Sequence, residues 1–170
     1  MRKIAVVDDE VEILQIIKNE LGDEIDDVIV NTFESPETFL DDRDLQNYDM
    51  IISDIKMPRM NGVQLYEKVT SLGYDGFFIF ISGCLDSYVR EIDTFVNSLS
   101  MEKPIDFDQL KNTIIQMFHL KKQYQKMLTI FLEGATRKKS DEFRKSYSDL
   151  MKMKMNLSVM STVNLNNKDT

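Results

Sequence analysis

The stretch MIISDIKMPRMNG (residues 50–62) joins an apolar run to an abrupt polar end. Its first three residues, 50–52, read as a buried strand, yet the strand runs into Asp54 and is followed by the stiff pair Met57-Pro58. A carboxylate at the end of a buried strand is costly unless a cation or hydrogen bonds compensate it. This stretch therefore predicts a strand that delivers Asp54 to a polar site.

Similar apolar runs, rich in Ile, Val and Phe, occur on both sides of this stretch, as expected for parallel strands buried on both faces. Segments with helical spacing alternate with them, and Gly22 and Gly73 stand where helices are predicted to end. Five strands alternating with five helices predict an α/β fold with a doubly wound, five-stranded parallel sheet. The predicted strands are 4–7, 28–30, 50–52, 77–81 and a weak 99–101, and the helical segments are 13–21, 36–40, 65–72, 89–96 and one that starts at Asp106.

The composition is that of a folded, water-soluble protein. The chain has 170 residues, of which 42% are hydrophobic and 29% charged. No apolar run is long enough to span a bilayer, and the start MRKIAVVDDE reaches acidic residues too early for a signal peptide. With a single cysteine, Cys84, no internal disulfide can form. We therefore expect a cytoplasmic protein.

Polar residues follow the predicted strands where a doubly wound sheet gathers its functional groups, at the carboxyl ends of the strands. Because three carboxylates brought together raise one another's pKa, a cation is needed, and Mg²⁺ suits carboxylate oxygens and phosphate. An ammonium and a hydroxyl can hold phosphoryl oxygens, which leaves Asp54 as a nucleophile that forms an acyl phosphate. We expect Met57-Pro58 to aim the Lys56 carbonyl at the metal. The residues concerned are Asp8 and Asp9, Asp54, Ser82 and Lys103.

These motifs resemble the receiver domain of bacterial two-component response regulators. The resemblance is carried by VVDDE, SDIKMPRMNG, FIFISG and MEKP together, and it covers about residues 1–118. It implies a flavodoxin-like receiver fold and a signalling module that is not an enzyme beyond its own phosphorylation and dephosphorylation. Asp54 would accept phosphate from a histidine kinase, a phosphotransfer protein or a small phosphodonor.

The same resemblance assigns a role to each site residue. Asp9 would bind Mg²⁺ directly and Asp8 through water, with the Lys56 carbonyl and Asp54 as further ligands. Ser82 would be the hydroxyl switch residue, and Lys103 would bind the phosphate.

One position departs from the family's pattern. Three residues before Lys103, where the family usually has Tyr or Phe, the chain has Ser100, and Val96-Asn97 replaces the usual Gly-Ala. The common output route through an aromatic rotamer is therefore in doubt, while the phosphate chemistry is unaffected.

Two other functions are less favoured. A receiver-like fold that never receives phosphate is disfavoured because all five site residues are present, and an enzyme is disfavoured by the first motif. An aspartate-nucleophile phosphatase of the haloacid-dehalogenase type would need Asp-x-Asp after the first strand, where this chain has DDE. His119 is expected to be a surface or packing residue, and Cys84 a small residue near the site.

The C-terminal part differs from the rest in charge. Residues 1–118 hold 10 basic and 24 acidic residues, whereas residues 119–170 hold 11 basic and 5 acidic ones. The last helix is predicted to continue past residue 118 along a seam, and a second helix is predicted from Ser140. The seam residues are Met117, Leu120, Tyr124, Met127 and Phe131.

We therefore divide the chain into a receiver domain, residues 1–118, and a C-terminal α-helical extension, residues 119–170. An apolar seam needs a partner, so we expect residues 119–160 to form a homodimer or to dock a partner protein. The alternative within one chain is that the two helices fold back on their own receiver. DNA binding by the basic residues 137–139, Lys152 and Lys154 is the alternative. It is less favoured because the segment is too short for a winged helix and shows no helix-turn-helix pattern.

Overall fold

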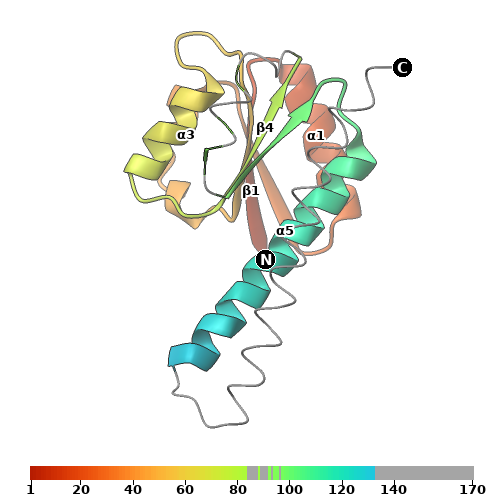
Figure 1. Cartoon of the computed structure of the whole chain (residues 1–170). Coiled ribbons are helices and arrows are strands. Elements are labelled where there is room, and N and C mark those ends of the chain that lie inside the picture. Colours follow the sequence, from red (N-terminus) through yellow and green to blue (C-terminus); the bar gives the residue numbers. More distant parts are fainter. Residues whose placement is uncertain (84–87, 89–91, 93, 96, 133–170) are drawn as a thin grey trace, which may run out of the picture. The chain divides into compact units, whose positions relative to one another are not determined.

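The computed structural model describes residues 1–83, 88, 92, 94, 95 and 97–132. Strands and helices alternate along this part of the chain (Figure 1). The strands are β1 (Arg2–Val7), β2 (Val28–Phe33), β3 (Met50–Asp54), β4 (Phe77–Ser82) and β5 (Ser98–Glu102). The helices are α1 (Val11–Glu24), α2 (Pro36–Leu40), the short 3-10 turn η1 (Leu45–Asn47), α3 (Gly62–Ser71) and α5 (Phe107–Leu132).

All five strands lie in one parallel sheet in the order β2-β1-β3-β4-β5. The order reverses direction beside β1, and α1 and α3 lie on opposite sides of the sheet (Figure 1). The register pairs Ile4 with Met50 and Ile52 with Ile79, so the three central strands end near one another. This is the predicted doubly wound fold.

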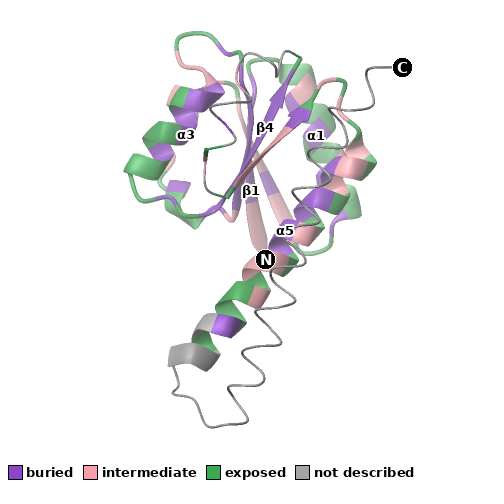
Figure 2. Ribbon diagram, in the orientation of Figure 1, coloured by how far each residue is buried: buried purple, intermediate pink, exposed green. Residues whose placement is uncertain are grey.

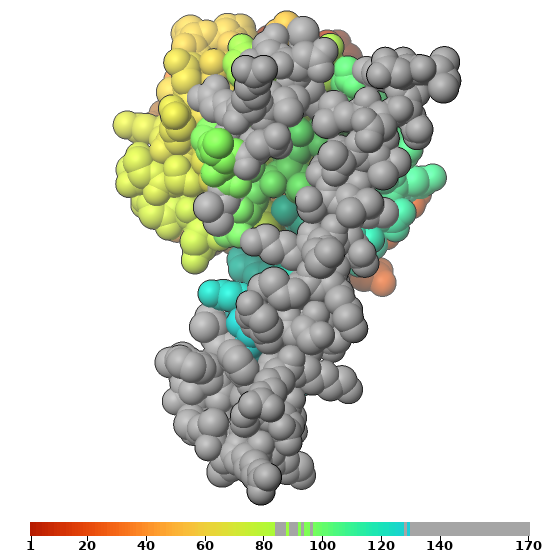
Figure 3. Space-filling view, in the orientation of Figure 1, coloured from red at the N-terminus to blue at the C-terminus, as the bar shows by residue number. Residues whose placement is uncertain are grey.

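The central strands are buried along most of their length. Every residue of β3 and β4 is buried, whereas β2 and β5, at the two edges, are mostly half-buried (Figure 2). Rings from β4 and α3 dominate one part of the core, where Phe78 and Phe80 contact Tyr66. Atoms of α3, in yellow, lie at the surface of the view in Figure 3. Burial on both faces explains why the strands read as continuous apolar runs.

The two glycines predicted to end helices behave differently. After α3, Gly73 adopts φ +92° and donates to the Thr70 carbonyl, while the next N–H, of Tyr74, donates to Val69, so the helix ends as predicted. The prediction for Gly22 is wrong, because α1 continues to Glu24. A glycine within a helix costs only about 1 kcal/mol, which does not outweigh packing of the rest of the helix.

The last described helix, α5, continues without a break through residue 118 to Leu132, as the seam predicted. By its internal contacts the chain forms two compact units, Met1–Phe107 and Asp108–Thr170. The helix predicted from Ser140 lies outside the described residues, as do Val89 and Val96 of the predicted fourth helix. Within the described part of the chain, no helix is both long and apolar enough to cross a membrane.

Candidate phosphoryl-acceptor site

Asp54 is the last residue of β3 and is only 6% exposed. Its neighbour Ile55 extends the ladder by donating to the Ile81 carbonyl of β4 at 3.0 Å, so the backbone on both sides of Asp54 is fixed. The Lys56 N–H then turns back and donates to Asp54 Oδ2. The carboxylate is therefore held by the chain that carries it, before any other side chain is considered.

Helix α3 begins in close contact with the end of β3. The Gly62 N–H donates to the Ile55 carbonyl at 2.9 Å, and a Cβ atom on Gly62 would lie 2.3 Å from the Asp54 carbonyl oxygen. Only glycine fits at this distance. Asn61 caps the helix by accepting from the Gln64 N–H, while the Gln64 side chain accepts from the Asn61 N–H. The quoted stretch thus ends at the residue that lets the loop close over Asp54.

Lys103 brings the strand ends together. Its N–H donates to the Ser82 carbonyl at 2.9 Å, which continues the pairing of β4 and β5 beyond the last strand residue, and its peptide bond to Pro104 is cis. The ammonium Nζ lies 2.9 Å from Asp54 Oδ1 and 3.1 Å from Asp8 Oδ2. One cation therefore bridges two buried carboxylates that come from different strands.

Asp8 follows β1 and is 2% exposed. Its Oδ1 atom accepts the Glu10 N–H at 2.9 Å, so each of the two bridged carboxylates has one backbone donor and one contact to Lys103. The side chain of Glu10 also reaches Lys103, with Oε1 at 3.4 Å from Nζ. The sequence interpretation missed Glu10 and Gly62, although both lie inside the motifs VVDDE and SDIKMPRMNG.

Electrostatics at the site reflects its burial. Burial raises the pKa of Asp54 above its ordinary value, against the opposing effect of Lys103, and the charge of Asp9 adds to the rise. Burial likewise raises the pKa of Asp8, with Lys103 and the Glu10 N–H acting in the other direction. Burial alone would lower the pKa of Lys103, but its contacts with Asp54 and Asp8 raise it overall. Lys103 therefore stays charged, and the two carboxylates are short of positive charge.

The other predicted residues lie around this core at different depths. Ser82, at the end of β4, is buried, whereas Asp9 and the side chain of Lys56 are exposed. Cys84 lies outside the described residues, and His119 is exposed on α5, within hydrogen-bonding distance of Gln123. The structure thus brings Asp8, Asp54 and Lys103 into direct contact.

A family model for the response regulator receiver domain matches residues 4–115, about two thirds of the chain. The chain belongs to this receiver family. The match includes every residue of the site described above. No match was found among curated protein sequences.

Solved receiver structures have the same fold. The receiver domain protein from Clostridium thermocellum is 28% identical, with a TM-score of 0.61 over 72% of this chain and 98% of that chain. TrrA from Thermotoga maritima, solved in complex with Mg²⁺ and BeF, is 28% identical, with a TM-score of 0.60 over 69% of this chain and 99% of that chain. DrrB from T. maritima is 22% identical, with a TM-score of 0.61 over 71% of this chain but only 54% of that chain, so this receiver matches about half of DrrB.

The site's oxygen atoms suit Mg²⁺ in kind. Carboxylates and a backbone carbonyl are the hard donors that this ion prefers, and the raised pKa values of Asp8 and Asp54 indicate a site that gains from another positive charge. In the described part of the receiver, however, no three acidic, His or Cys side chains are gathered closely enough to hold a metal ion. Instead, the Lys103 ammonium contacts Asp8 and Asp54 together. We conclude that the oxygen donors of the site suit Mg²⁺, and that in this structure the carboxylates of Asp8 and Asp54 are arranged around Lys103.

At position 100, where the family usually has Tyr or Phe, this chain has a serine. Ser100 lies in β5, pairs with Phe80 and is half-buried. Phe95, from the segment before β5, stacks on Tyr66 with ring centroids 4.2 Å apart and lies 6.0 Å from Phe80. An aromatic contact therefore joins α3 to the segment before β5, with no ring from β5 itself.

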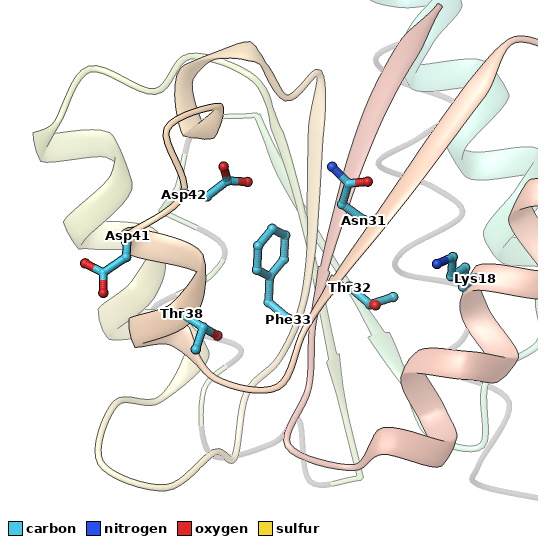
Figure 4. A pocket seen from close by; sticks show the side chains of 7 residues that line it. All are labelled: Lys18, Asn31, Thr32, Phe33, Thr38, Asp41 and Asp42. Atoms are coloured by element: carbon cyan, nitrogen blue, oxygen red, sulfur yellow. The ribbon is translucent and has the colours of Figure 1, made fainter.

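A shallow pocket lies beside the edge strand β2 (Figure 4). Phe33 points into it between Thr38 and Asp42, while Thr32 points toward the side of Lys18. Two of its lining residues are hydrogen-bonded to Tyr48, which accepts from Asn31 and donates to Asp42, both at 2.7 Å, and burial raises the pKa of Tyr48 to about 12. These three polar groups thus satisfy one another, and the pocket contains none of the predicted site residues. Its lining residues are Lys18, Asn31, Thr32, Phe33, Thr38, Asp41 and Asp42.

Proposed function

We propose that this receiver takes up one phosphoryl group on Asp54. The donor is the phosphohistidine of a sensor histidine kinase or a phosphotransfer protein, or a small phosphodonor. The observation that carries the proposal is the bridge from Lys103 to Asp8 and Asp54 at the carboxyl edge of the sheet. A cationic side chain that already contacts the acceptor is placed to receive the charge of an incoming phosphoryl group.

The chemistry is a displacement at phosphorus. An Asp54 carboxylate oxygen forms a bond to phosphorus while the bond from phosphorus to the donor's imidazole nitrogen breaks. The electron pair of the broken bond stays on that nitrogen, which takes a proton. Lys103 and the Ser82 hydroxyl would hold phosphoryl oxygens, and the backbone bonds to Asp54 keep the acceptor in place.

Mg²⁺ belongs to this proposal, held by Asp8, Asp9, Asp54 and the Lys56 carbonyl. When bound, the ion would neutralise negative charge that Lys103 alone leaves uncompensated. The cytoplasmic location expected from the sequence is consistent with a kinase donor.

The proposal predicts that wild-type protein gains the mass of one phosphoryl group when incubated with Mg²⁺ and a small phosphodonor. The Asp54→Asn variant should gain none, because the amide cannot form the acyl phosphate. Asp75→Asn, at an exposed aspartate away from the site, is the matched control and should label like wild type. Intact-mass spectrometry measures all three. Labelling that persists in Asp54→Asn would reject the assignment of the acceptor.

Output is proposed to run through residues 119–160, by homodimerisation or by docking a partner protein. The unbroken course of α5 to Leu132 supports this proposal. On the predicted seam Tyr124 is 48% exposed, whereas Met117 and Met127 are buried. DNA binding remains the alternative because the chain beyond residue 118 is basic. Binding of the full chain to duplex DNA that weakens steeply with salt would favour that alternative.

A further inference from the structure

Glu10 has a side chain that its own helix does not use. It is the N-cap residue of α1, but its side chain makes no capping hydrogen bond. The carboxylate extends to Lys103 instead, 93 positions away in sequence, with Oε1 at 3.4 Å from Nζ. The side chain is 63% exposed, so it lies at the solvent side of the buried Asp8–Lys103–Asp54 bridge.

The three carboxylates around Lys103 differ in how firmly they are held. Asp8 and Asp54 are buried, and each accepts a backbone N–H, from Glu10 and Lys56 respectively. Glu10 has no comparable anchor, and its charge faces water. Asp8 and Asp54 therefore define the site, while Glu10 adds a negative charge at its entrance.

That charge acts in opposite directions on the two kinds of ion the site would bind. An incoming phosphoryl group is an anion that must share Lys103 with Glu10 and is repelled by it. A dication bound beside Asp8 is attracted by the same carboxylate. Screening by water and salt weakens both effects without changing their signs.

We propose that Glu10 sets the phosphodonor specificity of this receiver, disfavouring small anionic phosphodonors that depend on charge attraction alone. A phosphohistidine presented by a protein is affected less, because contacts elsewhere on the two proteins supply its binding energy. Glu10 is a positioning residue that acts through Lys103 and through the local field. This inference rests on the proposed function.

The test compares Glu10→Gln with Glu12→Gln, an equal charge change at an exposed residue two positions along the chain. Calorimetry measures Mg²⁺ affinity, and ¹⁹F NMR measures beryllofluoride affinity at saturating Mg²⁺. For Glu10→Gln we expect Mg²⁺ affinity to fall and beryllofluoride affinity to rise, each by about 3- to 10-fold, as for one charge a few ångströms away that water screens. Both shifts should shrink in high salt, and Glu12→Gln should stay near wild type.

Labelling by acetyl phosphate supplies the third measurement. An Asp54 oxygen bonds to phosphorus as the bond from phosphorus to the acetate oxygen breaks, and acetate leaves. The rate should rise in Glu10→Gln in step with beryllofluoride affinity.

Because Mg²⁺ affinity should fall while beryllofluoride affinity rises, the expected result differs from that of a misfolded or distorted site. A variant with a distorted site would lose both affinities together, and that result would overturn the role of Glu10, as would equal shifts in the two variants. If wild-type protein binds Mg²⁺ and beryllofluoride but Glu10→Gln is unchanged, only this inference fails. If wild-type protein binds no beryllofluoride, the proposed function itself fails.

Discussion

Asp54 and Asp8 are buried carboxylates that share one ammonium, an arrangement that costs stability. Moving charged groups out of water is unfavourable, and a single lysine does not fully compensate two carboxylates. The raised pKa values of both groups express this deficit. The folded protein therefore holds a site that a further cation would stabilise.

The deficit predicts that Asp54→Asn is more stable than wild type at neutral pH in the presence of a chelator. Because the pKa of Asp54 is raised on folding, the folded state holds its proton more tightly than the unfolded state, whose value is near 3.8. Ionised Asp54 therefore does not destabilise the folded protein below about pH 3.8. The destabilisation grows as the pH rises from there through the pKa of Asp54 in the folded state. The melting temperature should rise by about 2–4 °C for each kcal/mol relieved, with the gain shrinking towards pH 4.

Thermal melts across this pH range check the prediction, with Asp75→Asn as the exposed control. Lys103 keeps Asp8 as a partner in Asp54→Asn, so the lysine is not left buried alone. A lower melting temperature at pH 7 would contradict the prediction.

The site was predictable in part because its residues follow strands. In a parallel sheet the carboxyl ends share one edge, so Asp8, Asp54 and Lys103 could be placed together from their positions after apolar runs. The contact of Glu10 with Lys103 was not predictable, since it depends on a rotamer at the start of α1. The requirement for Gly62 was hidden for a similar reason: it arises from the distance between two backbones.

At the scale of elements, the junction of β3 and α3 is tightly constrained. The strand end, the loop and the first turn of the helix are joined by backbone hydrogen bonds and by the Asn61–Gln64 cap. Since the Asp54 carbonyl faces the Cα of Gly62, any movement of α3 at its start is passed to Asp54.

We predict that Gly62→Ala destabilises the protein by about 1–3 kcal/mol, the usual cost of forcing an extra methyl group into a packed place. The clash is with backbone atoms, which cannot rotate away, so beryllofluoride binding should weaken as well. Gly22→Ala is the matched control. It lies in α1 with open space around the new methyl group, and it should stabilise by about 0.5–1 kcal/mol.

Chemical denaturation measures both variants. Equal stability of Gly62→Ala and wild type would show that the junction can relax, contrary to the packing described above.

The boundaries of helices and strands are where the sequence patterns predicted the structure least well. The weak run 99–101 proved to be part of β5, because pairing with β4 compensates for its polar residues. Helix α1 extended past Gly22, since the burial of Leu21 and Ile25 outweighs a single poor helix former. Tertiary contacts decided both cases, and a local pattern does not contain them.

For the whole molecule, the division of charge and the length of α5 point to contacts beyond the receiver. We predict that the full chain dimerises, at least with beryllofluoride bound, through the seam that includes Tyr124. Tyr124→Glu should give a monomer, because a carboxylate on an apolar seam is costly to bury. Gln125→Glu, an equal charge change at the next exposed position, should remain dimeric.

Light scattering of the full chain, with and without beryllofluoride, measures these states. A truncation after Phe118 would locate the contact within the extension. A monomeric wild type under both conditions would remove the dimer hypothesis and leave partner docking or DNA binding.

The unbroken α5 also restricts the form in which a signal can travel. Twenty-six helical residues make a rod about 39 Å long. A flexible tether between two parts of a protein works by setting how often their surfaces meet. A continuous helix cannot act in this way, because a rotation or displacement at one end moves the other end as well. The direction in which its C-terminal side chains face is fixed relative to its first turn. Inserting or removing a single residue near Phe118 would turn the seam by about 100°, so the helical phase of this segment, more than its length, is what the chain has to preserve.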